Sequence, residues 1–434
     1  MYIHFCLGVK RASINLILAI IFFVGMAVPT PAAATSRVSI YVMGDFAHPL
    51  IESFFPVKNA LADVEGWINS RGGVRGVPVE FVLQGGKKEA KPVNLVELFM
   101  GGGGDISSLF IGLEEETISY YNEVSRAGLP LVVNTDFISG STQALKSRFD
   151  EDKIVCFTTD ARIPTLYPAG YTFAIMPTYE DQFALFIDWL SKNEERPRLA
   201  LLTMEGIPLT SAHITKETLA FCEQAGVKVV ARETISLGIT ALDITPQLKR
   251  IKVRGANWIY LNLGGPFLQM GGASFKKAGL LGKVKLGLGS IGMDPQALLP
   301  LGKLAEGAAG VSPICSWDEV DNPGIKEISE VFEHEGRKPG ERSLTYLSIF
   351  TMGMVGVELI GRVVDEVGWG GLNGEAILKE LEKGKEVDSL GLTICQIPPG
   401  KRSLTYARIM EVQKGKIVPI SDWQPCPDMR PTIN

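Results

Sequence analysis

The chain contains 434 residues, of which 46% are hydrophobic, and its 43 Lys and Arg residues against 48 Asp and Glu residues give a formal net charge of −5. This acidic balance argues against nucleic acid as a partner, because proteins that bind nucleic acid present a basic surface. The hydrophobic fraction suits a large buried core, and the length predicts two or three domains.

The first 34 residues have the pattern of a secretory signal peptide. Lys10 and Arg11 precede an apolar run at residues 14–28, and Ala32-Ala33-Ala34 supplies the small residues for cleavage before Thr35. A membrane anchor is the alternative, but the apolar run is short and a cleavage sequence follows it. We therefore expect cleavage near Ala34 and a soluble periplasmic protein.

Strands and helices then alternate along the chain. A short apolar strand is predicted at residues 38–43, and four apolar residues at helical spacing follow it: Val57, Leu61, Val64 and Ile68. Glycine ends this helix and later ones, because the residue after a helix often takes a left-handed conformation. Further strands are predicted at residues 77–83, 109–111, 199–202, 258–263 and 284–288. This alternation predicts an α/β fold with parallel sheets, helices on both faces, and ligands at the carboxyl ends of the strands.

Two glycine-rich segments are candidates for phosphate cradles. The segment FMGGGGDISS at residues 99–108 precedes a predicted strand instead of opening a helix, and no GK[ST] follows it. The segment LNLGGPFLQMGG at residues 261–272 follows a strand and opens a helix, but it lacks the G-x-G-x-x-G spacing. Nucleotide binding is therefore disfavoured, and no cofactor is expected.

Cysteine and histidine residues do not form a metal-binding pattern. No CxxC spacing occurs, and the three His residues beyond the signal peptide, at positions 48, 213 and 334, are too scattered for a zinc site. In an exported chain one disulfide is plausible, and we expect Cys395 and Cys426 to form it. The apolar stretch at residues 346–360 is too short to span a membrane and contains Glu358, which predicts a buried helix.

The order of segments resembles that of the type I periplasmic binding proteins. The opening RVSIYVMGDFAHPL, followed by Ile68-Asn69, Gly72-Gly73-Val74 and Gly76, is similar to the start of the branch that serves branched-chain amino acid ABC transporters. The segments YTFAIMPTYEDQ and LAEGAAGVSP resemble the family's crossings between lobes, and ARIMEVQKGKIVPISDW resembles its closing hairpin. The likeness covers nearly the whole chain after the signal peptide.

This resemblance implies two doubly wound parallel-sheet lobes joined by three hinge crossings. Lobe 1 would comprise residues 35–176 plus 313–392, and lobe 2 residues 177–312 plus 393–434. The protein would be a monomeric, non-enzymatic solute-binding protein that clamps a small, partly apolar ligand and delivers it to a membrane permease. A sensory or regulatory module of the same fold is the alternative. A secreted enzyme is disfavoured, because neither a G-x-S-x-G elbow nor a dinucleotide fingerprint is present.

The resemblance also indicates where the ligand would lie. In amino-acid-binding relatives one loop holds the ligand carboxylate, and here that loop is GLEEETISYY at residues 112–121, in which Thr117 keeps a hydroxyl. The second carboxylate loop corresponds to Thr135, Asp136 and Phe137, with Phe137 in place of a Thr. Ser290 lies near the usual position of the acid that holds the amine. Pro208 and Gly264 lie near positions that are usually aromatic.

The three acidic residues of the first loop allow two interpretations. Glu114–Glu116 either form the first turn of a helix, where negative charge is stabilised by about 0.3–1 kcal/mol each, or place Glu115 or Glu116 in the cleft. A carboxylate in the cleft would repel an anionic head group. We therefore expect a cationic, neutral or inverted ligand at least as much as an α-amino acid, and weak binding of leucine, isoleucine and valine.

Aromatic residues near the ends of strands complete the candidate site. Phe46 and His48 line the cleft or pack within their loop, one of Phe54 and Phe55 faces the ligand or the hinge, and Tyr179 stacks on the ligand or packs at the hinge. Asp181 is expected to cap the following helix. The candidate ligand-binding residues are therefore Phe46, His48, Glu115, Glu116, Thr117, Thr135, Asp136, Phe137, Tyr179, Pro208, Gly264 and Ser290.

Overall fold

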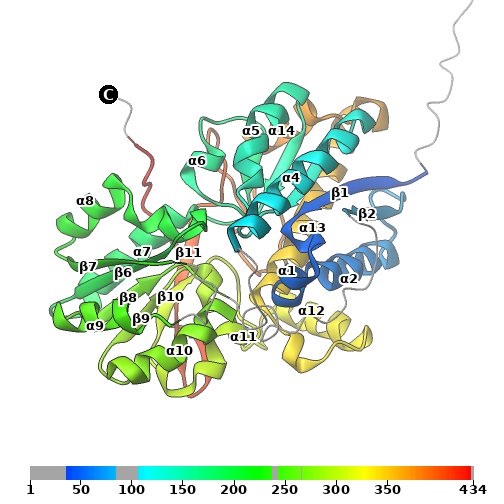
Figure 1. The fold of residues 1–434 in the computed structure, drawn as a ribbon. Coiled ribbons are helices and arrows are strands. Elements are labelled where there is room, and N and C mark those ends of the chain that lie inside the picture. Colours follow the sequence, from blue (N-terminus) through cyan, green and yellow to red (C-terminus); the bar gives the residue numbers. More distant parts are fainter. Residues whose placement is uncertain (1–35, 85–105, 237–242, 265, 432–434) are drawn as a thin grey trace, which may run out of the picture. The chain divides into compact units, whose positions relative to one another are not determined.

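The computed structural model describes residues 36–84, 106–236, 243–264 and 266–431. The predicted signal peptide and the glycines at 101–104 lie outside the described residues. Within the described residues two sheets form the framework (Figure 1).

The first sheet is entirely parallel and is built from the N-terminal part of the chain. Its strands run in the order β2-β1-β3-β4-β5, with β1 Val38–Gly44, β2 Val79–Leu83, β3 Leu131–Thr135, β4 Val155–Thr158 and β5 Thr172–Ala174. Strands β3 and β4 are buried along their whole length, as expected for central strands covered on both faces. The carboxyl ends of β1, β3 and β4 therefore lie side by side at one edge of this sheet.

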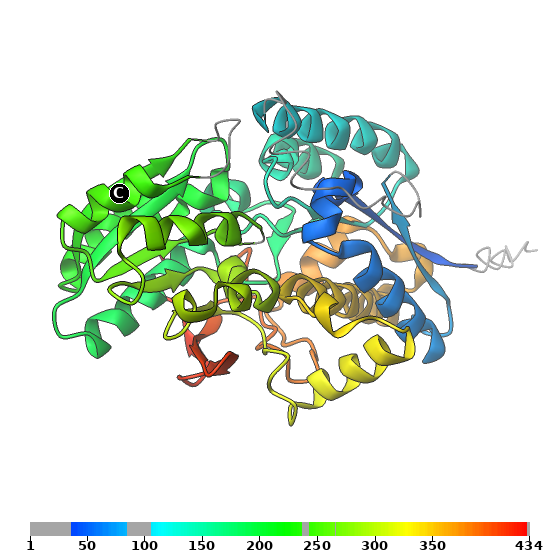
Figure 2. The same ribbon diagram turned by 60° about the horizontal axis from the view of Figure 1, so that its bottom comes forward.

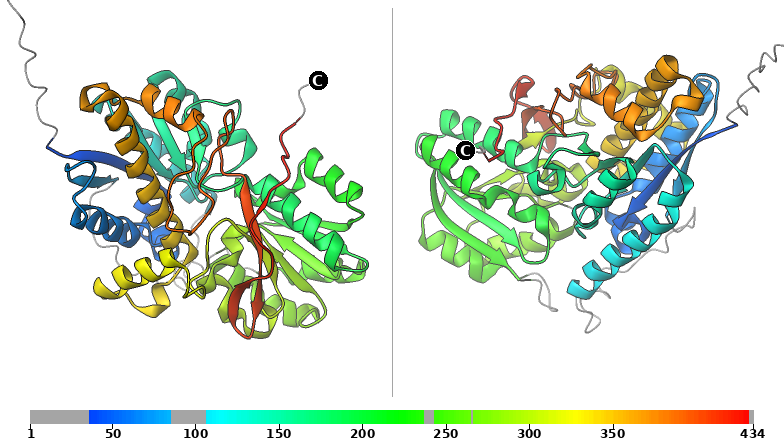
Figure 3. Two further views of the ribbon diagram at one scale, coloured as in Figure 1. Left: turned by 180° about the vertical axis from the view of Figure 1, so that it is seen from behind. Right: turned by 90° about the horizontal axis from the view of Figure 1, so that it is seen from above.

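The second sheet is mixed and closes with a hairpin from the end of the chain. Its strands run in the order β12-β11-β10-β9-β8-β6-β7, with β6 Arg198–Met204, β7 Lys228–Ile235, β8 Trp258–Leu261, β9 Lys285–Leu288, β10 Ala309–Ser312, β11 Tyr406–Gln413 and β12 Lys416–Pro419. Strand β11 pairs antiparallel with β10 and β12, and the short β13 (Gln424–Pro425) pairs with β11. Figure 3, left, shows this red hairpin from behind.

Helices cover the sheets, and α13 is the longest of those described. The helices are α1 Pro49–Phe54, α2 Val57–Ser70, α4 Ile106–Val124, α5 Ser141–Asp152, α6 Ile163–Leu166, α7 Tyr179–Asn193, α8 Lys216–Gln224, α9 Thr245–Val253, α10 Pro266–Ala278, α11 Pro295–Leu298, α12 Pro323–His334, α13 Leu344–Val367 and α14 Gly374–Glu382. Helix α2 buries the predicted Val57, Leu61, Val64 and Ile68. It packs against α13, as Figure 2 shows.

The chain passes between the two sheets three times. Strand β5 is followed by α7, which packs on β10 and β11, and β10 is followed by α12 and α13, which pack on α2. After α14, which contacts β4, the chain returns to β11. The connecting segments lie together, because the amide of Ala174 donates to the carbonyl of Arg402 at 2.8 Å and the amide of Cys315 to the carbonyl of Leu392 at 2.9 Å.

The strand predicted at residues 109–111 is wrong, because these residues belong to the 19-residue helix α4. A short apolar run does not distinguish a buried strand from a buried helix. The informative pattern lies further along, where Leu113, Thr117, Tyr121 and Val124 are buried at helical spacing. The glycine-rich segment at 99–108 therefore leads into a helix and not into a strand.

Helix α13 is longer than the apolar stretch predicted at residues 346–360. Its 24 residues are long and apolar enough to cross a membrane by length and composition alone. However, 72% of its most apolar window is buried inside the protein. The prediction that the stretch is too short to span a membrane is therefore wrong. The predicted buried helix is nevertheless what the structure contains.

Two smaller predictions are also wrong. The described cysteines, Cys395 and Cys426 among them, are free thiols. Cys395 lies beside Val355 and Leu359 of α13, whereas Cys426 packs against the core around α7 and β8. Asp181 does not cap α7, because Thr178 is the N-cap and its hydroxyl accepts the amide of Asp181 at 3.1 Å.

Candidate functional site

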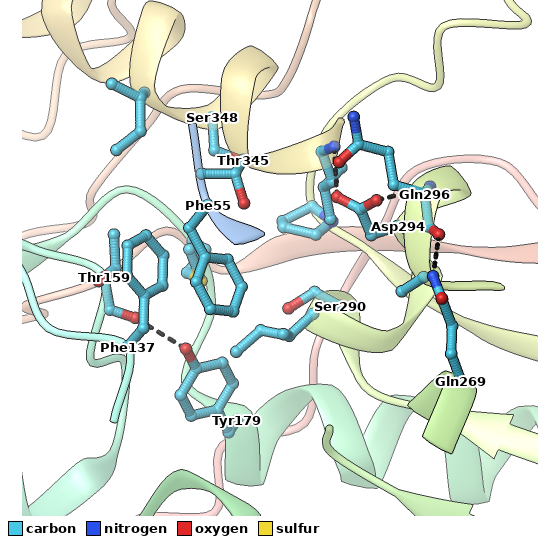
Figure 4. A pocket seen from close by; sticks show the side chains of 16 residues that line it. Phe55, Phe137, Thr159, Tyr179, Gln269, Ser290, Asp294, Gln296, Thr345 and Ser348 are labelled. Carbon is cyan, nitrogen blue, oxygen red and sulfur yellow. Dashed lines mark hydrogen bonds between the residues drawn. The ribbon is translucent and has the colours of Figure 1, made fainter. Parts of the chain in front are cut away.

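A cavity of about 200 Å³ lies where loops from both sheets meet. Its first side comes from the segments after β3, β4 and β5, and its second side from the segments after β9 and β10, with the start of α13 completing the wall (Figure 4). The lining residues are Phe55, Phe137, Thr159, Met176, Tyr179, Gln269, Ser290, Ile291, Asp294, Gln296, Ala297, Pro313, Leu344, Thr345, Ser348 and Ile349. Nine of these sixteen side chains are apolar or aromatic, and the other seven are polar.

Three aromatic rings form the apolar wall of the cavity. The rings of Phe55 and Phe137 stack with centroids 4.3 Å apart and planes 9° from parallel. Tyr179 is buried, and its hydroxyl donates to the carbonyl of Thr159 at 2.7 Å. This bond fixes the Tyr179 ring, so that its face and not its hydroxyl is the part available to a bound molecule.

The loop that carries Phe137 is held by two buried carboxylates. Asp45 Oδ2 accepts the amides of Phe137, Ile138 and Ser139 at 2.8, 2.7 and 3.2 Å. Asp136 accepts the amides of Gly140 and Thr142 at 2.8 and 2.7 Å. These bonds satisfy the backbone donors of a tight loop inside the protein, and they place the Phe137 ring against Phe55.

Burial changes the ionisation of these carboxylates. Burial raises the pKa of Asp45, and the amides that it accepts oppose the rise. Burial, followed by repulsion from Asp45 and Asp160, raises the pKa of Asp136 to about 7. Asp160 is paired with Arg162, whose Nε and Nη2 donate to it at 2.7 and 2.6 Å. The Nε–Nη2 edge of the guanidinium is therefore engaged within the protein.

The opposite side of the cavity contains a carboxylate that joins two helix starts. Asp294 caps α11 by accepting the amide of Gln296 at 2.8 Å, and its Oδ2 accepts the amide of Leu344, the first residue of α13, at 2.7 Å. Burial raises the pKa of Asp294 to about 6, although backbone amides from both helices oppose this rise. Gln296 adds a second connection, because its Nε2 donates to the carbonyl of Gly340 at 2.6 Å.

Two buried hydroxyl groups of the cavity wall lack a hydrogen-bond partner. Thr159 Oγ1 and Ser290 Oγ are buried, line the cavity and have no hydrogen-bond partner within the described part of the chain. Buried polar groups are normally hydrogen-bonded, so both hydroxyls need an external partner. The amide of Ser290 is held by Gln182 Oε1 at 3.2 Å, which fixes the orientation of that residue.

The residues described by the structure offer no metal site. Within them, no group of three or more His, Cys, Asp or Glu side chains is placed to hold a metal ion. The buried carboxylates near the cavity accept backbone amides or pair with Arg162 instead.

The structure places the twelve predicted site residues in four different surroundings. Phe137, Tyr179 and Ser290 line the cavity. Asp136 and Pro208 line one small adjoining pocket and Gly264 lines another. Phe46, Thr117 and Thr135 are buried outside the cavity wall, where the hydroxyl of Thr135 donates to the carbonyl of Met43 at 3.2 Å. Glu115 and Glu116 are exposed on α4 and His48 is partly buried, and none of the three is among the lining residues.

The acidic residues at 114–116 are not the first turn of a helix, because α4 begins at Ile106 and places them two turns inside it. Glu116 lies near His48 and acts to raise the pKa of the imidazole, although burial has the larger effect and lowers it. The interaction of Glu116 is thus with a neighbouring side chain outside the cavity wall.

The sequence interpretation missed several residues that line the cavity. Thr159 follows β4 as Phe137 follows β3, so the rule that sites lie at strand ends could have found it. Asp294 precedes Pro295, and Asp followed by Pro is typical of a helix start. Thr345 and Ser348 of α13 could not be predicted from the sequence, because they are far along the chain from the lining residues that follow the strands of the first sheet.

Comparison with known proteins identifies a matching family model and solved structures of the same fold. A family model described as Periplasmic binding protein matches residues 130–416. No curated protein matches the chain at a significant level of sequence similarity.

Solved structures share the fold at low sequence identity. A branched chain amino acid ABC transporter protein from Thermus thermophilus with bound valine has a TM-score of 0.72 and 19% identity, over 90% of this chain and 96% of that one. A solute binding protein from R. palustris in complex with 4-hydroxybenzoate has a TM-score of 0.66 and 18% identity, over 90% and 97%. A fatty acid ABC transporter substrate-binding protein from Thermomonospora curvata has a TM-score of 0.66 and 17% identity, over 90% and 92%.

Proposed function

Because the chain belongs to the periplasmic binding protein family, we propose that it is the extracytoplasmic solute-binding protein of an ABC importer. It binds a small, partly apolar organic solute between its two lobes and delivers it to the membrane permease without transforming it. The observation that carries this proposal is the cavity, because segments after strands of both sheets line it and nine of its sixteen lining residues are apolar or aromatic.

The arrangement of the chain supports a clamp mechanism. We propose lobe boundaries at residues 35–176 plus 313–392 and 177–312 plus 393–434, with the three connecting segments as hinges. In that division, Phe137 and Thr159 belong to one lobe and Ser290 and Asp294 to the other. A solute that contacts both lobes stabilises the arrangement in which they lie close together.

The proposal includes export and a ligand other than the common branched-chain amino acids. The signal pattern at residues 1–34 supports cleavage near Ala34 and a periplasmic location. The order of motifs and a valine-bound structural neighbour support the branched-chain amino acid branch of the family. Ser290 supplies no negative charge for an amine, which supports a ligand other than leucine, isoleucine or valine.

The solute can be identified by native mass spectrometry of the mature protein purified from its own host, which detects a small molecule carried through purification. Its affinity is then measured by calorimetry on protein that has been unfolded, dialysed and refolded. We expect Ser348→Phe to weaken binding at least tenfold, because the ring would fill space that Ser348 of α13 now leaves open to the cavity.

Ser147→Phe is the matched control, since Ser147 is an exposed serine on α5 and is not among the residues that line the cavity. This variant should bind as the parent does. Equal affinity of the Ser348→Phe variant and the parent would show that the solute binds elsewhere, and the proposed site would be wrong.

A further inference from the structure

The charges around the cavity restrict the head group of its ligand. Among the described residues that line it, none carries a positive charge, and Asp294 is the only one that carries a negative charge. Arg162 is not among these lining residues; it lines a small adjoining pocket together with Phe137, and the Nε–Nη2 edge of its guanidinium is paired with Asp160. A ligand carboxylate would therefore enter without a cationic partner.

The start of α13 would be the natural place for a ligand anion, because the first amides of a helix point outward and its dipole favours negative charge. Here the protein's own groups occupy these amides. Asp294 Oδ2 accepts the amide of Leu344 at 2.7 Å, and Asp294 also accepts the amide of Thr345. The hydroxyl of Ser343 accepts the amide of Tyr346 at 3.0 Å. The first three amides of the helix are thus unavailable to a ligand.

Two further carboxyl groups lie behind the aromatic wall. Asp45 holds the amide of Phe137, and Asp136 precedes that residue and repels Asp45. An anion in the cavity would face these two carboxyl groups from one side and the Asp294 carboxylate from the other. Desolvating a charge without a partner is costly, so this surrounding disfavours an anionic head group.

The groups that are free suit an uncharged ligand. Ser290 Oγ and Thr159 Oγ1 are hydroxyls without a partner in the described structure, and a hydroxyl both donates and accepts a hydrogen bond. The stacked rings of Phe55 and Phe137 offer an apolar surface. A cavity of about 150 Å³ is enough to bind benzene, so the cavity of about 200 Å³ has room for one ring with a small substituent.

We propose that the cavity selects an uncharged, ring-sized solute bearing a hydroxyl or amide group, and that Asp294 is the residue that excludes carboxylates. This inference rests on the proposed function, because it concerns the solute of the same cavity. Ser290 and Thr159 bind the polar group of the solute, and Phe55 and Phe137 contact its ring.

Three compounds of nearly equal shape test the charge preference: benzoate, benzamide and benzamidine carry a negative, zero and positive charge. Calorimetry on the refolded, ligand-free mature protein should show benzamide binding at least tenfold more tightly than benzoate. Tighter binding of benzoate would overturn the role of Asp294, and tighter binding of benzamidine would overturn the uncharged assignment. If none of the three binds while native mass spectrometry detects another solute, the ring-sized class is wrong but the proposed function stands.

Variants of Asp294 test the mechanism of exclusion. In Asp294→Asn we expect the affinity for benzoate to increase at least tenfold relative to that for benzamide. Asp321→Asn removes an exposed acid and should leave all affinities unchanged. If Asp294→Asn does not fold, Asp294→Ser keeps an N-cap for α11 and serves instead. An unchanged benzoate affinity in a folded variant would overturn the assignment of Asp294.

A substitution at one of the two unpartnered hydroxyls locates the probe. Ser290→Ala should weaken benzamide binding about fivefold, the effect of one lost hydrogen bond. Unchanged benzamide affinity in this variant would show that the probe does not use the Ser290 hydroxyl, and would overturn that part of the proposal.

Discussion

Asp63 of α2 connects three parts of the chain through its buried carboxylate. Arg337 Nη2 and Nε donate to it at 2.6 and 3.0 Å, and the Tyr346 hydroxyl donates to it at 2.6 Å. We expect Asp63→Asn to lower the free energy of unfolding by about 3–5 kcal/mol, because breaking a buried ion pair leaves the remaining charge without its partner. Urea unfolding followed by circular dichroism measures this loss.

The pair of Arg75 with Asp365 provides the control. It has the same two-pronged geometry, with Nε and Nη2 of Arg75 donating to the carboxylate, but both side chains are exposed. Asp365→Asn should therefore cost less than about 1 kcal/mol. Equal losses in the two variants would contradict the idea that burial gives the Asp63 group its importance.

The residues of the site were partly predictable from the sequence. Phe137, Tyr179 and Ser290 were found because the order of segments around them resembles that of a known family. The structure places all three in the cavity wall. Glu115 and Glu116 were assigned to a strand-end loop, but a continuous helix carries them at its exposed face. The cavity also depends on which distant segments meet, and a local sequence pattern does not contain that information.

At the level of elements, α13 approaches the first sheet closely at a glycine. A Cβ atom on Gly353 would lie 2.8 Å from Val64 Cγ1 on α2, which is too close for an unchanged backbone. We expect Gly353→Ala to destabilise the protein by about 1–3 kcal/mol, the usual cost of overpacking a core. Thermal unfolding of the variant and the parent tests this expectation.

Gly66 on α2 is the matched control, because nothing lies within 4 Å of a Cβ placed there. Gly66→Ala should stabilise the protein by up to about 1 kcal/mol, since alanine favours a helix over glycine. If both substitutions have the same sign, helix propensity and not packing determines the effect at Gly353.

The predictability of an element depended on its surroundings. Helix α2 was predicted because one face of it is buried, so its apolar residues recur at helical spacing. Helix α4 was missed because a short apolar run near its beginning suggested a strand. The helical spacing of its buried residues begins only at Leu113. The antiparallel pairing of β10 with β11 joins strands about a hundred residues apart, and its register was not predictable from either segment alone.

At the level of the whole molecule, buried acids determine how stability depends on pH. Burial raises the pKa of Glu52 and of Glu180 to about 8, and that of Asp136 to about 7. The folded protein therefore keeps protons that the unfolded chain has already released. Stability is present at lower pH and is lost as the pH rises toward about 8.

We expect the melting temperature to fall between about pH 6.5 and about pH 8.5, with a loss on the order of 1–2 kcal/mol for each buried carboxyl group. Glu180→Gln should reduce this fall, whereas Glu123→Gln, at an exposed position on α4, should not. Differential scanning calorimetry at both pH values measures the effect. A melting temperature that rises over this interval would contradict the sign. His213 has the opposite effect on stability, because burial lowers the pKa of its imidazole to about 3. The unfolded chain binds this proton only below its ordinary pKa of about 6.5, so the effect of His213 is confined to lower pH.

The last strands and helices of the chain complete both halves of the molecule, and this has a consequence for biosynthesis. Strands β1 to β5 are consecutive strands of the chain, but their sheet is covered by α13, which comes much later at residues 344–367. Likewise β11 at residues 406–413 extends the second sheet beyond β10. While the ribosome is still synthesising the protein, neither core has all of its parts. The emerging polypeptide should therefore stay unfolded until translation is nearly finished, which is the state that a translocation channel for unfolded chains requires.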